Sequence, residues 1–442
     1  MNLASTHELI QPHRSPCCMS TVCHITEARI MKAVRAAGLR PLTKRPLPNR
    51  RAFSTAPFDQ EAYLRRARSL LRPAHKTPIF DYMSATPSHL LNFSLAEHIP
   101  GEVHHPAEFR NLLPGGPTQT RPHFRAPISG KPLPLGHHLV YFGPQSFSSE
   151  LMPDGTVSDH CPGAPFTRRM WAGGSVRFAK GADGKTEGGP TTLDGRLAVC
   201  VEEVVGDPVI KGVEGQEKVF VQISRKYSLK YSLPARARRS TDLEMGQMVR
   251  EAEETPDIEE RRTLVFIRDR DHEETRERGK EKERDMSRLK RLKDRSWVPT
   301  YSFSLTPDRR LLFHFSALTF NAHAIHMDPR YAQEVEGHKD CLVHGPLSLS
   351  LMLMAVRAQA DKVEAEAGER VALAELNYRN LAPLYVGEEM KVCVRMREGA
   401  FPTEGREHTW DVWVEGPDGG FAVKGTAEMR FVSGSRGPES SD

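Results

Sequence analysis

The fold of the C-terminal part of the chain is decided by residues 344–356, HGPLSLSLMLMAV. Pro346 stands where the first turn of a helix tolerates proline, and the residues after it are apolar nearly all round, which is typical of a buried helix. Four strand candidates follow, separated by glycine, proline and acidic turns, at 371–378, 389–396, 408–414 and 421–431. A buried helix followed by an antiparallel meander predicts a sheet wrapped around a helix.

Just before this helix, residues 315–332, FSALTFNAHAIHMDPRYA, gather polar side chains that are suited to chemistry. Asn321, His323, His326 and Asp328 fall within eight positions, after a strand candidate at 310–315. Gly345 lies at the start of the helix, where backbone N–H groups without helical partners favour a developing oxyanion. The two segments together predict a site with a proton-transfer base and an oxyanion donor.

His326 is the candidate acid/base, because an ordinary imidazole pKa of about 6.5 lets it gain and lose a proton near neutral pH. A buried structural histidine is the alternative. Asn321 is expected to position a hydroxyl group or a water, and His323 to orient Asn321 or the water. Asp328 is expected to cap a helical turn at 328–334. The spacing His323-x-x-His326 also suggests a metal, but these histidines precede the helix and no third ligand has a recognised spacing, so we expect no metal.

The 442-residue chain is long enough for two domains, and its net charge of +5 is unevenly distributed. Residues 1–53 carry nine Lys/Arg against two acids, whereas the remainder has a net charge of −2. The basic excess therefore belongs to the N-terminus, and no nucleic-acid surface is predicted. No apolar run of about 18 residues predicts a membrane span. The seven cysteines lack the spacings of disulfide frameworks or zinc sites.

The N-terminus has the composition of a mitochondrial targeting segment. Residues 28–58 include no acid, and around 29–40 apolar and basic side chains fall on opposite faces of a helical wheel. The sequence Arg51-Ala52-Phe53-Ser54 is similar to a matrix-protease cleavage signal. A basic tail without a targeting role is the alternative. We predict a transit peptide at 1–53 and a protein of the mitochondrial matrix.

The rest of the chain divides into segments of different composition. An amphipathic helix is predicted at 59–71, within an otherwise irregular lead-in at 54–134. Strand candidates at 136–142, 174–178, 197–205, 218–224 and 264–267 indicate a β-rich N-terminal domain at 135–267, with a charged insertion around 235–260. A charged linker at 268–298, a C-terminal domain at 299–434 and a disordered tail at 435–442 complete the prediction.

Four segments carry a family resemblance: RRMWAGG at 168–174, LLFHFSALTFNAHAIHMDPRYA at 311–332, VHGPLSLSL at 343–351 and YRNLAPLYVGEE at 378–389. Together they resemble the MaoC-like hydratases and dehydratases, and more closely the fungal mitochondrial 3-hydroxyacyl-thioester dehydratases of type 2 and the related mesaconyl-CoA hydratases. The resemblance implies an α+β double hot-dog fold, with antiparallel sheets each wrapped around a central helix. It also implies a non-catalytic first repeat that helps to form the acyl pocket, and a catalytic second repeat.

The same resemblance assigns roles to single residues. His326 matches the catalytic histidine of the hydratase signature, whereas Asn321 stands where the wider family has aspartate and His323 where many relatives have asparagine. The exchange at Asn321 matters, because an amide neither accepts the proton nor holds a charge beside His326. Gly345 would donate to the thioester oxygen. Five residues are candidates for binding the substrate or the phosphates of its carrier: His323, Arg168, Arg169, Trp171 and Arg379. For the arginines a surface position is the alternative, and for Trp171 a place in the core.

The implied reaction is removal of water from a (3R)-3-hydroxyacyl thioester to give the trans-2-enoyl thioester in mitochondrial type II fatty acid synthesis. The alternatives are hydration of a short dicarboxylic acyl-CoA and thioester binding without catalysis. No cofactor is expected. The expected partner is acyl carrier protein or coenzyme A bearing the acyl group, and a homodimer remains open.

Overall fold

An antiparallel sheet organises the residues that the computed structural model describes, which are 58–103, 127, 129–179, 191–229, 241–269, 297–368, 370–397 and 407–432. Ten of its strands form the order β1-β3-β5-β6-β2-β8-β11-β10-β9-β7, and β4 pairs with β5. The predicted transit peptide, most of the charged linker and the tail lie outside the described residues. All the elements below belong to one unit that begins at Asp59.

Both halves of the chain combine several strands with a few α-helices. The strands are β1 (Lys76–Tyr82), β2 (Arg168–Phe178), β3 (Leu197–Val204), β4 (Val209–Lys211), β5 (Lys218–Ser228), β6 (Ile258–Ile267), β7 (Tyr301–Leu305), β8 (Arg370–Asn380), β9 (Met390–Met396), β10 (Glu407–Glu415) and β11 (Phe421–Val432). The α-helices are α2 (Gln60–Leu71), α3 (Ala85–Leu95), α4 (Asp242–Glu254), α6 (Arg309–Leu318) and α7 (Gly345–Ala367). The four strands predicted after 370 are confirmed as β8 to β11.

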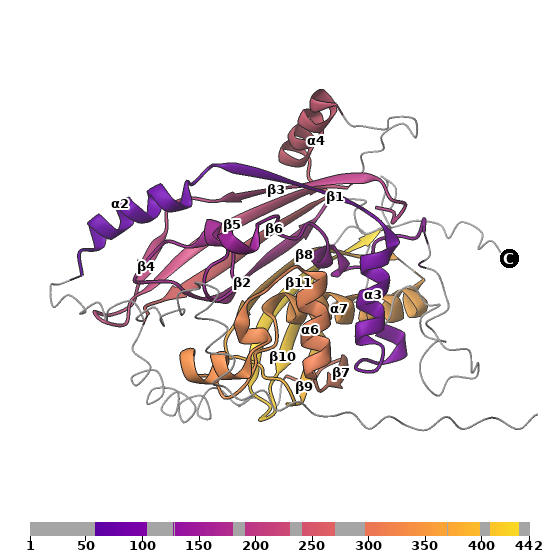
Figure 1. Ribbon diagram of the computed structural model, residues 1–442. Coiled ribbons are helices and arrows are strands. Elements are labelled where there is room, and N and C mark those ends of the chain that lie inside the picture. Colours follow the sequence, from indigo (N-terminus) through magenta and orange to yellow (C-terminus); the bar gives the residue numbers. More distant parts are fainter. Residues whose placement is uncertain are drawn as a thin grey trace, which may run out of the picture. The chain divides into compact units, whose positions relative to one another are not determined.

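Helix α7 is the centre of the C-terminal half and packs against β7, β8, β9 and β10 (Figure 1). Pro346 lies in its first turn, and Gly368 ends it in the left-handed conformation that glycine adopts most easily. Its middle is buried on every side, because Leu351, Met352 and Leu353 are all inaccessible to solvent. The predicted sheet around a buried helix, and with it the α+β hot-dog class, is confirmed.

The two halves join through β2 and β8, which pair antiparallel from Gly173 opposite Arg379 to Arg177 opposite Glu375. This makes one continuous sheet from the strands of both repeats. Gly173 and Gly174 permit the junction: a Cβ on Gly173 would overlap the carbonyl of Tyr378, and one on Gly174 would overlap the carbonyl of Arg261. The two glycines of the RRMWAGG segment therefore let three strands approach where the repeats meet.

In the N-terminal half, the structure differs from several predictions of secondary structure. The lead-in, expected to be irregular apart from the confirmed helix α2, contains β1 and α3. The strand predicted at 136–142 is instead a 3-10 turn, η4 (His137–Val140), because Gly136 has a positive φ of 85° and its carbonyl accepts a hydrogen bond from Ser350 Oγ at 3.3 Å. Further short turns are η1 (Gly101–Val103), η5 (Ser148–Glu150) and η6 (Ser158–His160).

The charged insertion predicted around 235–260 contains, in its described part, helix α4 and the first residues of β6. Thr241 and Glu244 form a capping box at the start of α4. Met248 and Ala252 pack on the face of β3 that carries Val199 and Val201. Two apolar residues at helical spacing are thus enough to hold an otherwise charged helix to the sheet.

The strand predicted at 310–315 is helix α6. Asp308 caps it by accepting a hydrogen bond from the backbone N–H of Leu311 at 2.8 Å. Leu311, Leu312 and Phe315 are buried at helical spacing, and α6 packs against α3. Two short turns follow, η7 (Ala324–His326) and the π-helical η8 (Tyr331–Val335), which is the helical turn predicted near 328–334.

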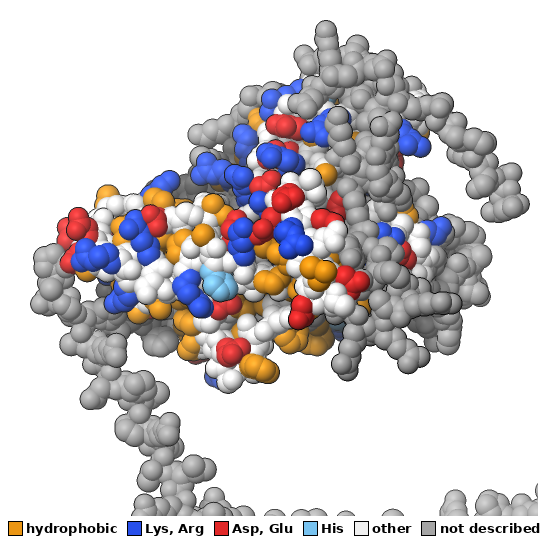
Figure 2. Space-filling view, turned by 90° about the horizontal axis from the view of Figure 1, so that it is seen from above, with side chains coloured by type: hydrophobic (Ala, Val, Ile, Leu, Met, Phe, Trp, Pro, Cys, Tyr) orange, Lys and Arg blue, Asp and Glu red, His pale blue; other side chains and the backbone are white. Residues whose placement is uncertain are grey.

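Charges of both signs are interspersed on the face of the molecule shown in Figure 2. Exposed ion pairs contribute to the local balance, for example Arg68 with Asp207 at 2.6 Å and Arg177 with Glu375 at 3.1 Å. Such exposed pairs add little to stability. Among the described residues, no helix has the length and apolar character needed to cross a membrane.

Candidate active site

The polar loop after α6 is held in place by an uncommon helix end. The N–H of Asn321 donates to the carbonyl of Ser316 at 2.9 Å, and the N–H of Phe320 donates to the carbonyl of Ala317 at 3.2 Å. This pair of bonds is the Schellman motif, which normally places glycine in the left-handed conformation. Here Phe320 takes it, with φ of 50°, while its side chain is 67% exposed. The chain reverses at this residue, just before Asn321 and His323.

We expect Phe320→Gly to raise the free energy of unfolding by about 0.5–1 kcal/mol relative to Phe320→Ala, because glycine adopts the left-handed conformation without steric cost. Little apolar burial is lost, since the side chain is mostly exposed. Urea unfolding of the two variants measures the difference. A Phe320→Gly protein less stable than Phe320→Ala would show that the backbone at 320 is not strained.

His326 is buried at the end of η7 and presents one free nitrogen. Its Nδ1 lies 2.9 Å from the carbonyl oxygen of Leu342, and because a carbonyl only accepts, Nδ1 carries the proton. Nε2 therefore keeps its lone pair. Burial lowers the pKa of His326 to about 4, and the charge of Arg169 acts in the same direction. His326 is thus a neutral imidazole at physiological pH, which is the form that accepts a proton.

His344 supports the ring of His326. The two imidazoles stack with centroids 3.7 Å apart and an interplanar angle of 20°. His344 Nε2 is 2.8 Å from Ser316 Oγ, which ties it to the last turn of α6. Burial lowers the pKa of His344 well below its ordinary value, and His326 adds to this shift. Both rings are therefore neutral, and their stacking fixes the plane in which His326 Nε2 lies.

Asn321 lines the same cavity and is oriented by its own loop. Its Oδ1 accepts a hydrogen bond from the backbone N–H of His323 at 3.1 Å. Among the described residues, none accepts a hydrogen bond from its Nδ2 group. The amide thus offers N–H donors to a ligand and no carboxylate, as the sequence predicted.

Gly345 lies in the first turn of α7, beneath the junction of the two repeats. A Cβ at this position would come within 3.1 Å of Trp171 Cβ and 3.3 Å of Asn380 Nδ2. The N–H groups of Gly345 and Leu347 precede the first helical hydrogen bond, in which Ser348 donates to the carbonyl of His344 at 3.1 Å. Because Pro346 has no N–H and Leu347 does not line the cavity, the N–H of Gly345 is the oxyanion donor that the helix start can offer.

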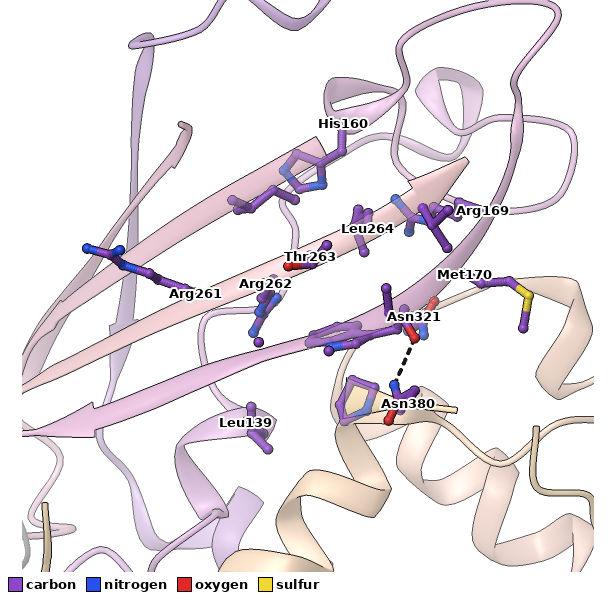
Figure 3. A pocket seen from close by; sticks show the side chains of 18 of the residues that line it. Leu139, His160, Arg169, Met170, Arg261, Arg262, Thr263, Leu264, Asn321 and Asn380 are labelled. Carbon is purple, nitrogen blue, oxygen red and sulfur yellow. Dashed lines mark hydrogen bonds between the residues drawn. The ribbon is translucent and has the colours of Figure 1, made fainter. Parts of the chain in front are cut away.

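Trp171 connects the repeats above Gly345. Its Nε1 donates to Tyr378 Oη at 2.8 Å, and its carbonyl oxygen accepts from Asn380 Nδ2 at 2.8 Å, the dashed bond in Figure 3. The guanidinium of Arg262 lies 4.9 Å from the centre of the indole. Trp171 is therefore fixed from three sides, and it forms a wall of the cavity as predicted for a substrate-contacting residue.

Of the five residues predicted to bind substrate, His323 lines the cavity, and the other four separate into two groups. Arg168 does not line the cavity, because its guanidinium is paired with Glu336 at 2.7 Å and also donates to the Glu336 carbonyl. Trp171, Arg169 and the exposed Arg379 do line it. Successive residues of a strand point to opposite faces, so β2 sends neighbouring arginines in opposite directions. Among the described residues, none forms an ion pair or hydrogen bond with Arg169.

These residues surround a cavity of about 1490 Å³ that both repeats line (Figure 3). Leu139, Trp171 and Arg262 come from the first repeat, and Asn321 and His326 from the second. Among the described residues, no group of three His, Cys, Asp or Glu side chains is arranged to hold a metal ion. The arrangement can place a thioester between a neutral imidazole and the helix-start amide, which suits proton abstraction next to a carbonyl group.

Two residues that contribute to the site were not predicted from the sequence. Asp154 approaches His323, with Oδ2 3.5 Å from Nε2, from a turn far earlier in the chain. Glu260 is fully buried and holds Arg262 through two bonds of 2.7 and 2.8 Å. The apolar run at the end of IEERRTLVFI indicates a strand, but nothing in the sequence indicates which of the preceding charges are buried. The Pro153-Asp154-Gly155 turn signal predicts a turn without indicating its partner.

A sheet wrapped around a helix, with a buried neutral histidine beside the helix start, is the arrangement expected of a hot-dog hydro-lyase. The family model of hydroxyacyl-thioester dehydratase type 2 matches residues 136–386, more than half of the chain. The chain belongs to this family. The resemblance predicted from the four segments is confirmed, as is the enzyme class.

Similar proteins include two curated relatives. The mesaconyl-C(4)-CoA hydratase of Chloroflexus aurantiacus is 28% identical over 314 residues, which cover 69% of this chain and 86% of the relative. The mitochondrial hydroxyacyl-thioester dehydratase type 2 of Schizosaccharomyces pombe is 23% identical over 324 residues, 72% of this chain and 90% of the relative. A solved MaoC-like dehydratase from Phytophthora capsici is 11% identical, with a TM-score of 0.48, over 83% of this chain and 98% of that structure.

Proposed function

We propose that the enzyme removes water from (3R)-3-hydroxyacyl thioesters to give trans-2-enoyl thioesters, in type II fatty acid synthesis of the mitochondrial matrix. The observation that carries the reaction is a neutral His326 with a free Nε2, stacked beside the start of α7. The acid-free basic N-terminus and the mitochondrial relative from Schizosaccharomyces pombe support the location. The reaction, its direction and the site residues are proposals on this basis.

In the proposed reaction His326 Nε2 takes the proton from Cα of the substrate. Negative charge then develops on the thioester oxygen, and the N–H group of Gly345 donates a hydrogen bond to it. The C3–O bond breaks as the Cα=C3 double bond forms, and His326 returns its proton to the departing hydroxide to give water. The Asn321 amide donates to the 3-hydroxyl and orients it. His326 ends neutral, so one histidine balances the reaction in either direction.

The full chain is expected to hydrate a crotonyl thioester with a turnover number above about 1 s⁻¹. Loss of the conjugated enoyl absorbance measures this, with coenzyme A and acyl carrier protein as alternative carriers. If fatty acid synthesis is the role, kcat/KM should be higher with acyl carrier protein. Binding of both thioesters without turnover of either would contradict the enzyme and favour a thioester-binding protein.

Hydration of a short dicarboxylic acyl-CoA is a second candidate, and Arg169 favours it. This guanidinium lines the cavity, forms no direct ion pair with a carboxylate among the described residues, and is close enough to the site for its charge to lower the pKa values of His323 and His326. A carboxylate on the acyl chain would give it a partner. A mesaconyl thioester in the same assay separates the candidates, because a higher kcat/KM than with crotonyl thioesters would favour the dicarboxylic substrate.

A further inference from the structure

A buried turn of the first repeat holds Asp154 in a fixed orientation. Met152 donates its N–H to the carbonyl of Thr156, and Gly155 donates to the carbonyl of Met152, both at 2.8 Å. Asp154 Oδ1 accepts two bonds from Thr156, from its backbone N–H at 2.9 Å and its hydroxyl at 2.7 Å. Asp154 is only 8% exposed. One carboxylate oxygen is therefore used by the turn, and Oδ2 remains for another partner.

This turn docks directly on the catalytic loop of the second repeat. The N–H of Ala324 donates to the carbonyl of Asp154 at 2.8 Å. Gly155 has a φ of 82°, and a Cβ there would overlap the carbonyl of Ala322. Asp154 Oδ2 lies 3.5 Å from His323 Nε2. The turn thus packs against the loop that carries Asn321, His323 and His326, although the turn belongs to the first repeat and the loop to the second.

The charges around His323 give the carboxylate a function. The groups that lower its pKa are, after burial, His326 of η7, Arg169 of β2 and His338 of the loop after η8. All of them are cations or become cations, whereas Asp154 is a carboxylate whose Oδ2 lies 3.5 Å from His323 Nε2. The rings of His323 and His326 meet edge to face with centroids 5.5 Å apart. Positive charge that forms on His326 during proton transfer is therefore felt at His323 and at Asp154.

We propose that Asp154 is a positioning residue of the active site. Because a carboxylate only accepts hydrogen bonds, Oδ2 selects the tautomer of His323 that carries its proton on Nε2, and it offsets the charge that His326 gains. The loop itself offers no carboxylate at Asn321, so the first repeat supplies one from outside. This role rests on the proposed dehydratase reaction.

Asp154→Asn tests the proposal, because it removes the charge while the amide oxygen can still accept the bonds of the turn. In the full chain we expect kcat for a crotonyl thioester to fall on the order of 10- to 100-fold, with KM changed less than about threefold. Thr156→Val is the matched control, since it removes one bond of the same turn and leaves the charge. It is expected to keep kcat within about threefold of the wild type.

A second variant distinguishes charge from structure. Adding Asn321→Asp to Asp154→Asn returns a carboxylate to the loop beside His323 and should recover at least about tenfold of the lost kcat. Asp154→Asn with wild-type kcat, or an equal loss in Thr156→Val, would overturn the proposal. So would a double variant no better than Asp154→Asn.

One measurement does not depend on the reaction. Nitrogen-15 NMR of the histidine rings, with the His323 signal assigned through His323→Gln, should show the proton on Nε2 in the wild type and a changed tautomer population in Asp154→Asn. An unchanged tautomer would overturn the positioning role. A changed tautomer in a protein that turns over neither crotonyl nor mesaconyl thioesters would leave the positioning intact and refute the proposed reaction instead.

Discussion

His326→Gln is expected to lower kcat by about 10³-fold and to change KM by less than about threefold. Glutamine can still donate a side-chain N–H to the Leu342 carbonyl, so the bond that orients His326 can be kept. It offers no basic nitrogen to the substrate. Steady-state kinetics with a crotonyl thioester measures the loss, and thermal unfolding shows whether the variant is folded.

The pH dependence of the wild type checks the same residue. Burial lowers the pKa of His326 to about 4, and the base is active only when neutral. The value of kcat/KM should therefore stay constant as the pH falls through 6.5 and decline with a midpoint near the lowered pKa. His314→Gln is the control, because His314 is exposed on α6. His326→Gln with the wild-type rate, or a decline centred on 6.5, would remove His326 from the proposed role.

The sequence predicted the second repeat well because its signals are local. An apolar helix with Pro346 in its first turn, followed by four strand patterns, is enough to predict a sheet packed around that helix. The strand predicted at 310–315 failed for a related reason. LLFHF is apolar enough for either element, and the choice depended on the cap at Asp308 and on the partner helix α3.

The site residues that lie on one loop could be predicted from the sequence. Those that come together only where the two repeats meet could not. Asn321 and His326 lie five positions apart, and the structure places both on the same cavity. Asp154 reaches the loop only through the tertiary fold. Arg168 and Arg169 look equivalent in the sequence. Because side chains alternate along β2, Arg168 pairs with Glu336 and Arg169 lines the cavity. A single sequence contains no information about such pairings.

Gly345→Ala is expected to lower kcat by about 10²-fold, because the new Cβ would press on Trp171 and displace the helix start that bears the oxyanion donor. Trp171 cannot easily move away from the new Cβ. Trp171 is held by Tyr378 through its indole N–H and by Asn380 through its carbonyl. Overpacking of this kind should also lower the free energy of unfolding by about 1–3 kcal/mol. Steady-state kinetics and urea unfolding measure the two effects.

Gly246→Ala is the matched control for this prediction, since it makes the same chemical change within helix α4. The nearest atom to its new Cβ is Arg250 Nη1 at 3.6 Å, an ordinary contact. We expect wild-type kcat and a gain in stability of about 0.5–1 kcal/mol, because alanine is the better helix former. Because only the new Cβ of Gly345→Ala meets a tight contact, the two variants should differ in activity. If Gly345→Ala keeps the wild-type kcat, the helix start tolerates displacement, and the oxyanion donor must be sought elsewhere in the cavity.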